Sequence, residues 1–537
     1  MSNYEKYAVA ALFLVFAATL APWSANFPLN DDWAYAVAVR TLSSTGRLAL
    51  SDWGSSTQIM HILAGALTAK LFGFSFGALR AMNVCIAAGA LFVFVKLLEE
   101  FGAGSFEKLA AGLALAFCPL YLVLANSFMT DVHYFFWMLA ATYFFVRRLN
   151  DPSDGRALVW AGACSAAAYL TRQIGLALPL AFTLTLLLQG RPRWRDLAGA
   201  WALPAAAAAG YYLWFHYVNG PTWASVNYVS GATISHVQDA GRFASDSFYR
   251  LFASAIETGL LLLPLAAGFA FSARKFFVKN GLHRKIAAAG PALALAALAV
   301  FALVNGPLPY LENNMTRTGL GVLTLGGAGK PSGFFGSQLF WYACTAASVL
   351  SIALLFCASG LALRAGTPAL RFVFAASMTQ LAVSMLGAKF FDRYLLTLLP
   401  WFAVAAAFAA RGVKLSRAGV LAGLLLCAAA GWAGMRDYLA WNAAKWELAL
   451  KPRPGLAPAD ISNGFDYEAW FSYEKNMAYL KSMKPLPMIG EWEWQQLNNY
   501  KAIVAFSPNP DLKVADRIEY STPLSSRKGV LYLLTAK

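Results

Sequence analysis

Long apolar runs alternate with short polar turns along most of this chain. Runs of nearly 20 residues can cross a hydrocarbon core about 30 Å thick as helices. The sequence holds about 13 such runs, at 7–24, 81–98, 109–125, 132–146, 157–171, 174–189, 197–218, 251–271, 286–304, 338–363, 372–388, 394–410 and 418–435. This pattern predicts an α-helical polytopic membrane protein with about 13 transmembrane helices.

A further apolar segment, at 58–73, is interrupted by polar residues and glycines. Whether it spans the membrane decides the side of every later loop. If it lies along the outer surface as an interfacial helix, the basic loops at 147–148, 191–195 and 274–285 all fall on the cytoplasmic side. Since cytoplasmic loops carry an excess of Lys and Arg, we predict an inside N-terminus and an outside C-terminus.

The chain becomes polar after the last apolar run, over residues 436–537. Within it, 466–481 has a helical pattern, and Tyr500–Phe506 and Gly529–Leu534 have the pattern of strands. We therefore predict two parts: a transmembrane domain over 1–435 and a small α+β domain, 436–537, outside the membrane.

Composition supports a membrane protein. The chain is 59% hydrophobic and 13% charged, whereas soluble domains carry about 25% charged residues. The net charge of +16 would suggest nucleic acid in a soluble chain. Here the basic residues lie in short loops, so we expect membrane lipids and no nucleic acid as partners. The six cysteines fall inside apolar runs and none has zinc-ligand spacing, so we expect neither a metal site nor disulfides.

The first outer loop, 25–80, places two adjacent carboxylates, Asp31 and Asp32, where the chain leaves the membrane. Carboxylates are costly inside a bilayer, but at its boundary they can face water and a lipid headgroup together. One alternative is that the pair caps a helix at 33–43; the two roles can coexist. A divalent metal site is possible but not favoured, because adjacent side chains diverge.

The predicted topology brings other charged residues to the same face. Asp131 opens a span on the outer side, Arg172 lies in a tight outer turn, and Lys389 and Arg393 share another. A carboxylate there can take a proton from an attacking hydroxyl, while Arg and Lys can hold a phosphate. Alternatively, Asp131 is only a helix cap, and Lys389 and Arg393 only extend to the membrane surface. Nucleotide sugars are not readily supplied outside the cytoplasm, so a sugar donor there is better carried on a lipid phosphate.

Five short motifs in this order resemble those of a known family, the GT-C integral membrane glycosyltransferases. The branch is that of the protein O-mannosyltransferases and the bacterial aminoarabinose transferases acting on lipid A. The resemblance covers roughly residues 1–440. The motifs are Asp31-Asp32-x-x-Tyr35-Ala36, Leu71-Phe72-Gly73 to Leu79-Arg80, Met129-Thr130-Asp131, Leu170-Thr171-Arg172, and Arg393-Tyr394-Leu395-Leu396 with Pro400. The chain departs from the family pattern at Asp32, where Glu is usual, and at Ala34, where many members carry Arg.

The resemblance implies a metal-free enzyme without a cofactor, which inverts the anomeric carbon. Its donor is a sugar on polyprenyl phosphate, and its acceptor is a lipid, glycan or protein hydroxyl. Asp31 would be the catalytic base. The substrate-binding residues would be Asp32, Tyr35, Asp131, Arg172, Lys389 and Arg393. The resemblance places the enzyme in a bacterial inner membrane, with its active site and C-terminal domain facing the periplasm.

A transporter or flippase of a lipid-linked or small polar substrate is the alternative function. Transporters place ionisable groups and broken helices near the membrane midplane, often within repeated halves. This chain shows no repeat of fixed period, and its charged residues gather at one predicted face. A non-catalytic scaffold that displays 436–537 would not need the acids of the first loop. We therefore favour an enzyme.

Overall fold

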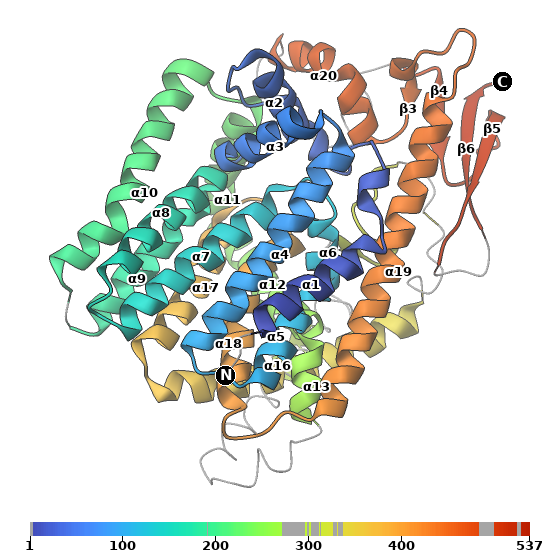
Figure 1. The fold of residues 1–537 in the computed structure, drawn as a ribbon. Helices are drawn as coiled ribbons and strands as arrows, with labels where there is room; N and C mark the ends of the chain where they lie inside the picture. The colour runs from blue at the N-terminus through green and yellow to red at the C-terminus, as the bar shows by residue number, and fades with distance from the viewer. Residues whose placement is uncertain are drawn as a thin grey trace.

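The structure is a computed structural model of the chain. It is a body of packed helices with a small sheet beside it, at the C-terminal end of the sequence (Figure 1). The predicted basic loop at 274–285 and nearly all of the predicted span at 286–304 lie outside the described residues. The residues described are 4–190, 192–270, 296–297, 300–301, 311, 313–325, 330, 337–482, 499–523 and 528–537.

Helices make up most of the described chain, as the apolar runs predict. The α-helices of the first half are α1 (Glu5–Ala18), α2 (Asp32–Thr45), α3 (Ile59–Phe72), α4 (Phe76–Glu100), α5 (Ser105–Ala116), α6 (Pro119–Ala125), α7 (Thr130–Asn150), α8 (Gly155–Thr171), α9 (Ala177–Leu188) and α10 (Trp194–Trp214). Those that follow are α11 (Ala232–Gln238), α12 (Ala240–Leu261), α13 (Leu263–Ala270), α16 (Gln338–Ala365), α17 (Pro368–Leu386), α18 (Leu399–Ala409), α19 (Arg417–Leu450) and α20 (Phe465–Ser482).

Four described helices are long and apolar enough to cross a membrane, and the number rises to six if each of two bent pairs counts as one span. The protein is thus a multi-pass membrane protein, but the predicted number of about 13 spans is not confirmed. One reason is that some apolar runs break. The run at 109–125 bends by 61° between α5 and α6, and that at 251–271 bends by 72° between α12 and α13. A proline stands in the first turn of the second helix of each pair, where it cannot continue the preceding hydrogen-bond ladder.

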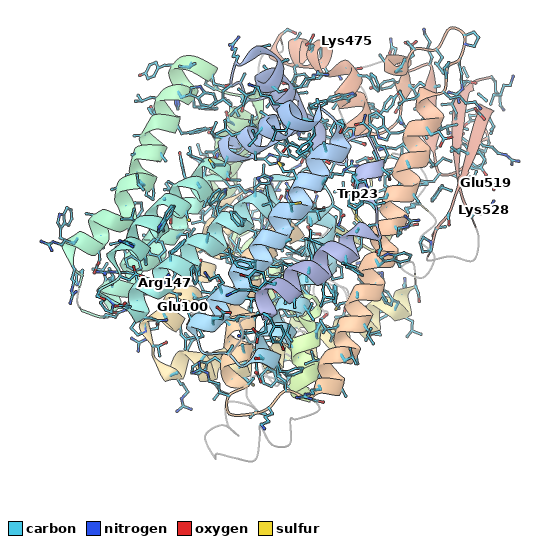
Figure 2. The ribbon with its side chains drawn as sticks, in the orientation of Figure 1. Trp23, Glu100, Arg147, Lys475, Glu519 and Lys528 are labelled. Carbon is cyan, nitrogen blue, oxygen red and sulfur yellow. The ribbon has the colours of Figure 1, made fainter. Side chains whose placement is uncertain are left out.

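The ends of the helices separate two poles of the molecule. The start of α1 and the end of α4 meet at one pole, where Lys6 pairs with Glu99 at 3.8 Å and Lys108 with Glu5 at 3.1 Å. Glu100 and Arg147 lie close together near this pole, far from Lys475 on α20 (Figure 2). The helices α2, α3 and α20 lie at the opposite pole (Figure 1). The acidic loop is therefore at the pole away from the N-terminus, as predicted.

The segment predicted to lie on the surface forms α3. At 14 residues and about 1.5 Å per residue it is about 21 Å long, short of the hydrocarbon core. Its residues Leu63, Leu67, Leu71 and Phe72 are all exposed. The i, i+4 spacing of Leu63, Leu67 and Leu71 puts these three on one side of the helix, and this arrangement fits a helix lying in the interface.

The C-terminal region is joined to the helical body by α19, a single helix of 34 residues. Beyond it, β3 (Ile461–Ser462), β4 (Ala502–Ala505), β5 (Leu512–Tyr520) and β6 (Gly529–Ala536) form a sheet in the order β3-β4-β6-β5. β3 and β4 pair in parallel, and the other neighbours are antiparallel. With α20, these strands confirm the predicted helix and both predicted strands. A second, two-stranded sheet pairs β1 (Met315–Thr316) with β2 (Gly319–Leu320).

Candidate active site

A buried ion pair fixes the loop that carries the two adjacent acids. Asp32 is fully buried, and its two oxygens accept hydrogen bonds from the backbone amides of Phe128 at 2.8 Å and Leu29 at 3.2 Å. The guanidinium of Arg80 on α4 lies 3.9 Å from Asp32 and donates to the carbonyls of Ala25 and Phe27. Asp32 therefore ties the first outer loop to the chain just before α7, which brings Asp31 and Asp131 into one region.

This position changes the interpretation of Asp32. Burial raises its pKa to about 7, against the lowering effects of Arg80 and the two amides. It lies outside the residues that line the nearby cavity, and its bonds hold the loop; its contact with a substrate stays a prediction. Tyr35, also predicted to bind substrate, lies on α2 with its ring 5.3 Å from that of His61 and does not line the cavity.

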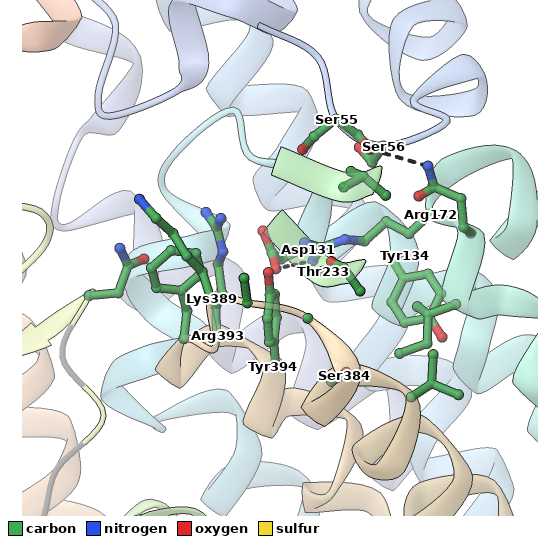
Figure 3. A pocket seen from close by; sticks show the side chains of 18 of the residues that line it. Ser55, Ser56, Asp131, Tyr134, Arg172, Thr233, Ser384, Lys389, Arg393 and Tyr394 are labelled. Atoms are coloured by element: carbon green, nitrogen blue, oxygen red, sulfur yellow. Dashed lines mark hydrogen bonds and ion pairs between the residues drawn. The ribbon is translucent and has the colours of Figure 1, made fainter. Parts of the chain in front are cut away.

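A cavity of about 540 Å³ opens beside Asp31, and five predicted site residues line it: Asp31, Asp131, Arg172, Lys389 and Arg393. They come from four separate stretches of sequence. Figure 3 shows Arg172 approaching Asp131 from one side, with Lys389 and Arg393 on the other. The wall also includes the apolar side chains of Phe135, Ile174, Val383 and Leu396. The cavity thus combines acids, cations and an apolar surface.

Asp31 is the N-cap residue of α2, but within the described residues its side chain makes no capping hydrogen bond. Instead, Oδ1 accepts a hydrogen bond from the indole Nε1 of Trp53 at 3.2 Å, and Oδ2 lies 3.9 Å from Nη1 of Arg393. The side chain of Asp31 is 16% exposed. Burial raises the pKa of Asp31, while Arg393, Trp53 and Lys389 oppose that rise. The carboxylate is therefore shielded, but still open toward the cavity.

Asp131 lies in the first turn of α7, whose N-cap is Met129, so it is not the capping residue. It pairs with Arg172, the C-cap residue that follows α8. The guanidinium of Arg172 lies over the ring of Tyr394, 5.4 Å from its centre. Oδ2 of Asp131 has no hydrogen-bond partner among the residues that the structure describes. One carboxylate oxygen thus holds Arg172 and the other remains available.

Arg393 lies in the first turn of a short 3-10 helix, Asp392–Thr397, which precedes α18. Its guanidinium stacks near the rings of Phe391 and Tyr394, at 4.9 and 5.9 Å from their centres. Across the described part of the chain, Nε and Nη1 of this side chain find no hydrogen-bond acceptor. Nη1 lies beside the carboxylate of Asp31 at 3.9 Å, too far for a hydrogen bond. Because buried polar groups in proteins are normally hydrogen-bonded, both donors are suited to an anion in the cavity.

The turn that carries Lys389 is held from two sides. Arg250 at the middle of α12 donates to the carbonyls of Met385 at 2.9 Å and Gly387 at 2.6 Å through Nη1, and to Ala388 at 2.7 Å through Nη2. On the other side, Asp392 accepts hydrogen bonds from the backbone amides of Asn314 and Met315, both at 2.6 Å. These contacts fix the positions of Lys389 and Arg393 relative to Asp31.

Sequence reasoning missed several residues of this site. Trp53 contacts Asp31 directly, and Ser55, Ser56, Gln173 and Tyr394 line the cavity. Tyr394 lies inside a family motif and could have been found there. Trp53 follows Asp31 by 22 positions across an irregular loop, so no periodicity connects the two. In the chain as described, no group of three or more His, Cys, Asp or Glu side chains is arranged to hold a metal.

Residues 57–214 match the family model of the dolichyl-phosphate-mannose-protein mannosyltransferases. This stretch is similar to those enzymes. The match confirms the resemblance predicted from the motifs, and with it the predicted class, a membrane glycosyltransferase. It includes Asp131 and Arg172 and stops short of Asp31 on one side and Arg393 on the other. No curated protein sequence matches the chain significantly.

Solved structures of low similarity extend over most of the chain. One is ArnT from Cupriavidus metallidurans bound to undecaprenyl phosphate, with 14% identity and a TM-score of 0.40 over 99% of this chain and 98% of that one. Another is the archaeal oligosaccharyltransferase AglB from Archaeoglobus fulgidus, in complex with an inhibitory peptide and a dolichol-phosphate. It has 16% identity and a TM-score of 0.46 over 94% of this chain and 70% of that one.

Proposed function

We propose that this protein transfers a sugar from a polyprenyl-phosphate donor to an acceptor hydroxyl at the outer face of a bacterial inner membrane. The cavity and residues 436–537 would then face the periplasm. Two observations support the proposal: the match to a mannosyltransferase family and the position of the cavity at the pole away from the N-terminus. The acceptor would be a lipid, a glycan or a protein.

One observation carries the proposal most directly. The same cavity holds a shielded carboxylate and cations from three different chain segments, with apolar side chains beside them. Transfer from a lipid-linked sugar phosphate needs these three features: a base for the acceptor proton, cations for the donor phosphate and an apolar surface for the lipid tail. Arg393, whose Nε and Nη1 have no hydrogen-bond acceptor among the described residues, is suited to grip phosphate oxygens.

The proposed reaction is a single displacement. The acceptor oxygen attacks the anomeric carbon, and Asp31 takes the acceptor proton. The bond from that carbon to the phosphate oxygen breaks, and polyprenyl phosphate leaves with the electron pair. Arg393 and Lys389 stabilise the departing phosphate, since preorganised cations act on charge where it develops. Attack opposite the leaving group inverts the anomeric centre.

The transporter alternative has less support from this arrangement. The ionisable groups of the cavity cluster near one pole, in loops and at helix ends. A transporter would hold them near the midplane, between broken helices. No contact among the described residues specifically favours transport over transfer.

The decisive test is consumption of a polyprenyl-phosphate sugar by purified protein in detergent, compared with Asp31→Asn. The amide keeps the shape of the side chain and cannot accept the proton, so transfer should fall by about 10²–10⁴-fold while thermal unfolding stays unchanged. Asp52→Asn, a neighbouring carboxylate outside the cavity, is the matched control and should retain activity. Turnover of Asp31→Asn close to wild type would remove Asp31 as the base.

A further inference from the structure

A second, smaller cavity adjoins the first. It has a volume of about 300 Å³, at the lower end of the range of about 300–1,000 Å³ for small-molecule sites. Ser55, Ser56, Gln173 and Val229 line both cavities. The loop that carries Trp53, the partner of Asp31, therefore forms the wall between them. A molecule in the second cavity would lie beside residues that also line the cavity of Asp31.

The backbone around this cavity has an uncommon conformation. Two π-helical segments border it: Phe215–Asn219, of five residues, and Ser225–Gly231, of seven. The π-helix accounts for well under 1% of residues in proteins, and it occurs frequently at functional sites. Both segments supply lining residues, Phe215 and His216 from the first and Ser225, Val226, Val229 and Ser230 from the second. Two such segments at one cavity indicate a built site.

Direct hydrogen bonds fix the residues between these two segments to the loop that carries Trp53. The hydroxyl of Thr222 donates to the carbonyl of Gly54 at 2.7 Å, and the amide of Ala224 donates to the carbonyl of Asp52 at 2.9 Å. The ring of Trp223 also stacks on Trp53 at 5.7 Å, with an angle of 8° between the planes. The second cavity and the environment of Asp31 are thus parts of one connected unit.

The chemistry of the second cavity differs from that of the first. Its described lining contains no Asp, Glu, Lys or Arg; its polar side chains are hydroxyls, an amide and an imidazole. Tyr211 and Phe215 stack on one another at its edge, 5.4 Å apart with an angle of 18°. Hydroxyl and amide groups can exchange hydrogen bonds with sugar hydroxyls, and aromatic faces cover the apolar face of a sugar ring. A phosphate or carboxylate would find no charged partner there.

We propose that this second cavity binds an uncharged sugar unit of the acceptor, whose free hydroxyl is then presented to Asp31. The inference rests on the proposed function and adds to it: the acceptor is a neutral glycan rather than an acidic sugar or a peptide. The wall of Ser55 and Ser56 would orient the ring between the two cavities. The charged cavity holds the donor phosphate, and the uncharged one selects the acceptor.

Binding can be tested by saturation-transfer NMR on purified full-length protein, in a detergent without a sugar headgroup. The probes are neutral methyl hexosides of the gluco, manno and galacto series, methyl glucuronide, and a short uncharged peptide containing Ser and Thr. Wild-type protein should bind at least one neutral hexoside at concentrations up to about 10 mM. It should bind neither the glucuronide nor the peptide. Absence of hexoside binding, or preference for the glucuronide or the peptide, would overturn the proposal.

Two matched variants locate the binding. Ser230 and Ser235 are both exposed, and each hydroxyl donates to a nearby carbonyl of its own segment, but only Ser230 lines the cavity. Ser230→Trp should fill the cavity and weaken hexoside binding by about tenfold or more, whereas Ser235→Trp should leave it unchanged. Equal binding by both variants would place the sugar elsewhere.

Donor consumption by the same preparations separates the two proposals. Suppose that Ser230→Trp loses hexoside binding but wild-type protein consumes no polyprenyl-phosphate sugar. This result would contradict the proposed function and support the sugar site. If wild-type protein consumes the donor but binds no hexoside, the proposed function is supported and the sugar site is contradicted. Arg393→Ala should retain hexoside binding, because it lies in the other cavity.

Discussion

Two neighbouring carboxylates do different work in this protein because their partners differ. Asp32 is fully buried and bound to two amides beside Arg80, so its oxygens are committed to holding the loop. Asp31, one residue earlier, faces the cavity with one indole and one guanidinium near it. Opposing influences of burial and nearby cations on its pKa suit a group that must both lose and accept a proton.

Trp53 should tune the basicity of Asp31. Its indole N–H donates to the ionised carboxylate and so lowers the pKa of Asp31, against the effect of burial. Trp53→Phe keeps the ring but removes the donor, which should raise that pKa. A base must be deprotonated to act, so the acid limb of the pH–rate profile should move to higher pH. Arg393, Lys389, Asp131, Arg172 and Tyr35 surround the same carboxylate and remain in place.

The control for this change is Trp223→Phe, which alters the ring stacked on Trp53 and keeps the bond to Asp31. Its acid limb should coincide with that of wild type. A limb that shifts equally in both variants would mean that the stacking, and not the hydrogen bond, sets the pH dependence.

Arg393 should act through donor affinity. Removing charge-assisted hydrogen bonds costs about 1.5–3 kcal/mol each, so Arg393→Ala should raise the donor concentration needed for half-saturation at least about tenfold. Arg393→Lys should be impaired less, because it keeps the charge without the bidentate geometry. Titration of a short-chain polyprenyl-phosphate sugar measures both. An unchanged curve for Arg393→Ala would transfer the phosphate-binding role to Arg172.

Among the elements of the fold, the turn between α17 and α18 positions the proposed phosphate site. Arg250 donates hydrogen bonds to three carbonyls of this turn, those of Met385, Gly387 and Ala388. Asp392 accepts hydrogen bonds from the backbone amides at 314–315. Lys389 and Arg393 are therefore presented by a turn with little freedom. Rigid support of this kind keeps binding groups in the geometry that a ligand needs.

Loss of Arg250 should weaken donor binding without any direct contact. Arg250→Met removes the bonds to Met385, Gly387 and Ala388, which should release the turn and raise the donor requirement by about tenfold, equivalent to about 1.4 kcal/mol. The maximal rate should change less than the half-saturation concentration. Arg47→Met, at an exposed arginine, is the control. A variant that melts earlier yet binds donor as wild type does would make Arg250 purely structural.

The sequence predicted the helices and strands better than the bends between them. Apolar length located α4, α16, α17 and α19, and strand patterns located β4 and β6. The bends at Pro119 and Pro264 were not predicted, since an apolar run gives no direction to its two halves. Motifs located four of the predicted cavity residues, Asp31, Asp131, Arg172 and Arg393, and the predicted outer turn added Lys389. Trp53 and Arg250 were not predicted, because their partners lie far away in the sequence and no periodic pattern connects them.

For the whole molecule, the attachment of the C-terminal region depends on a buried pair. Lys445 on α19 donates to both oxygens of Asp466 on α20, at 2.6 and 2.8 Å, and both side chains are fully buried. Helix α20 continues from there to the acidic loop, where the hydroxyl of Tyr473 accepts a hydrogen bond from the amide of Asp52 at 2.6 Å. The C-terminal region thus braces the loop beside Asp31.

Breaking this pair should destabilise the protein strongly. Lys445→Met leaves the Asp466 carboxylate buried beside an apolar side chain, and loss of one partner of a buried pair costs about 3–5 kcal/mol. Lys451 pairs with Asp516, and the Lys451 side chain is 62% exposed. Lys451→Met should therefore lower the free energy of unfolding by no more than about 1 kcal/mol. Thermal unfolding in one detergent compares the two. Equal melting temperatures would show that Lys445 does not secure the region.

Because α19 is long, the position of the acidic loop should depend on the thickness of the lipid bilayer. Its 34 residues extend for about 51 Å at about 1.5 Å per residue, against about 30 Å of hydrocarbon. No proline interrupts the helix, so its two ends move as one body. Longer lipid chains would be matched by tilting the helix or by drawing more of it into the hydrocarbon. Either response would carry α20 with it, so the chain length of the surrounding lipids would bear on the acidic loop.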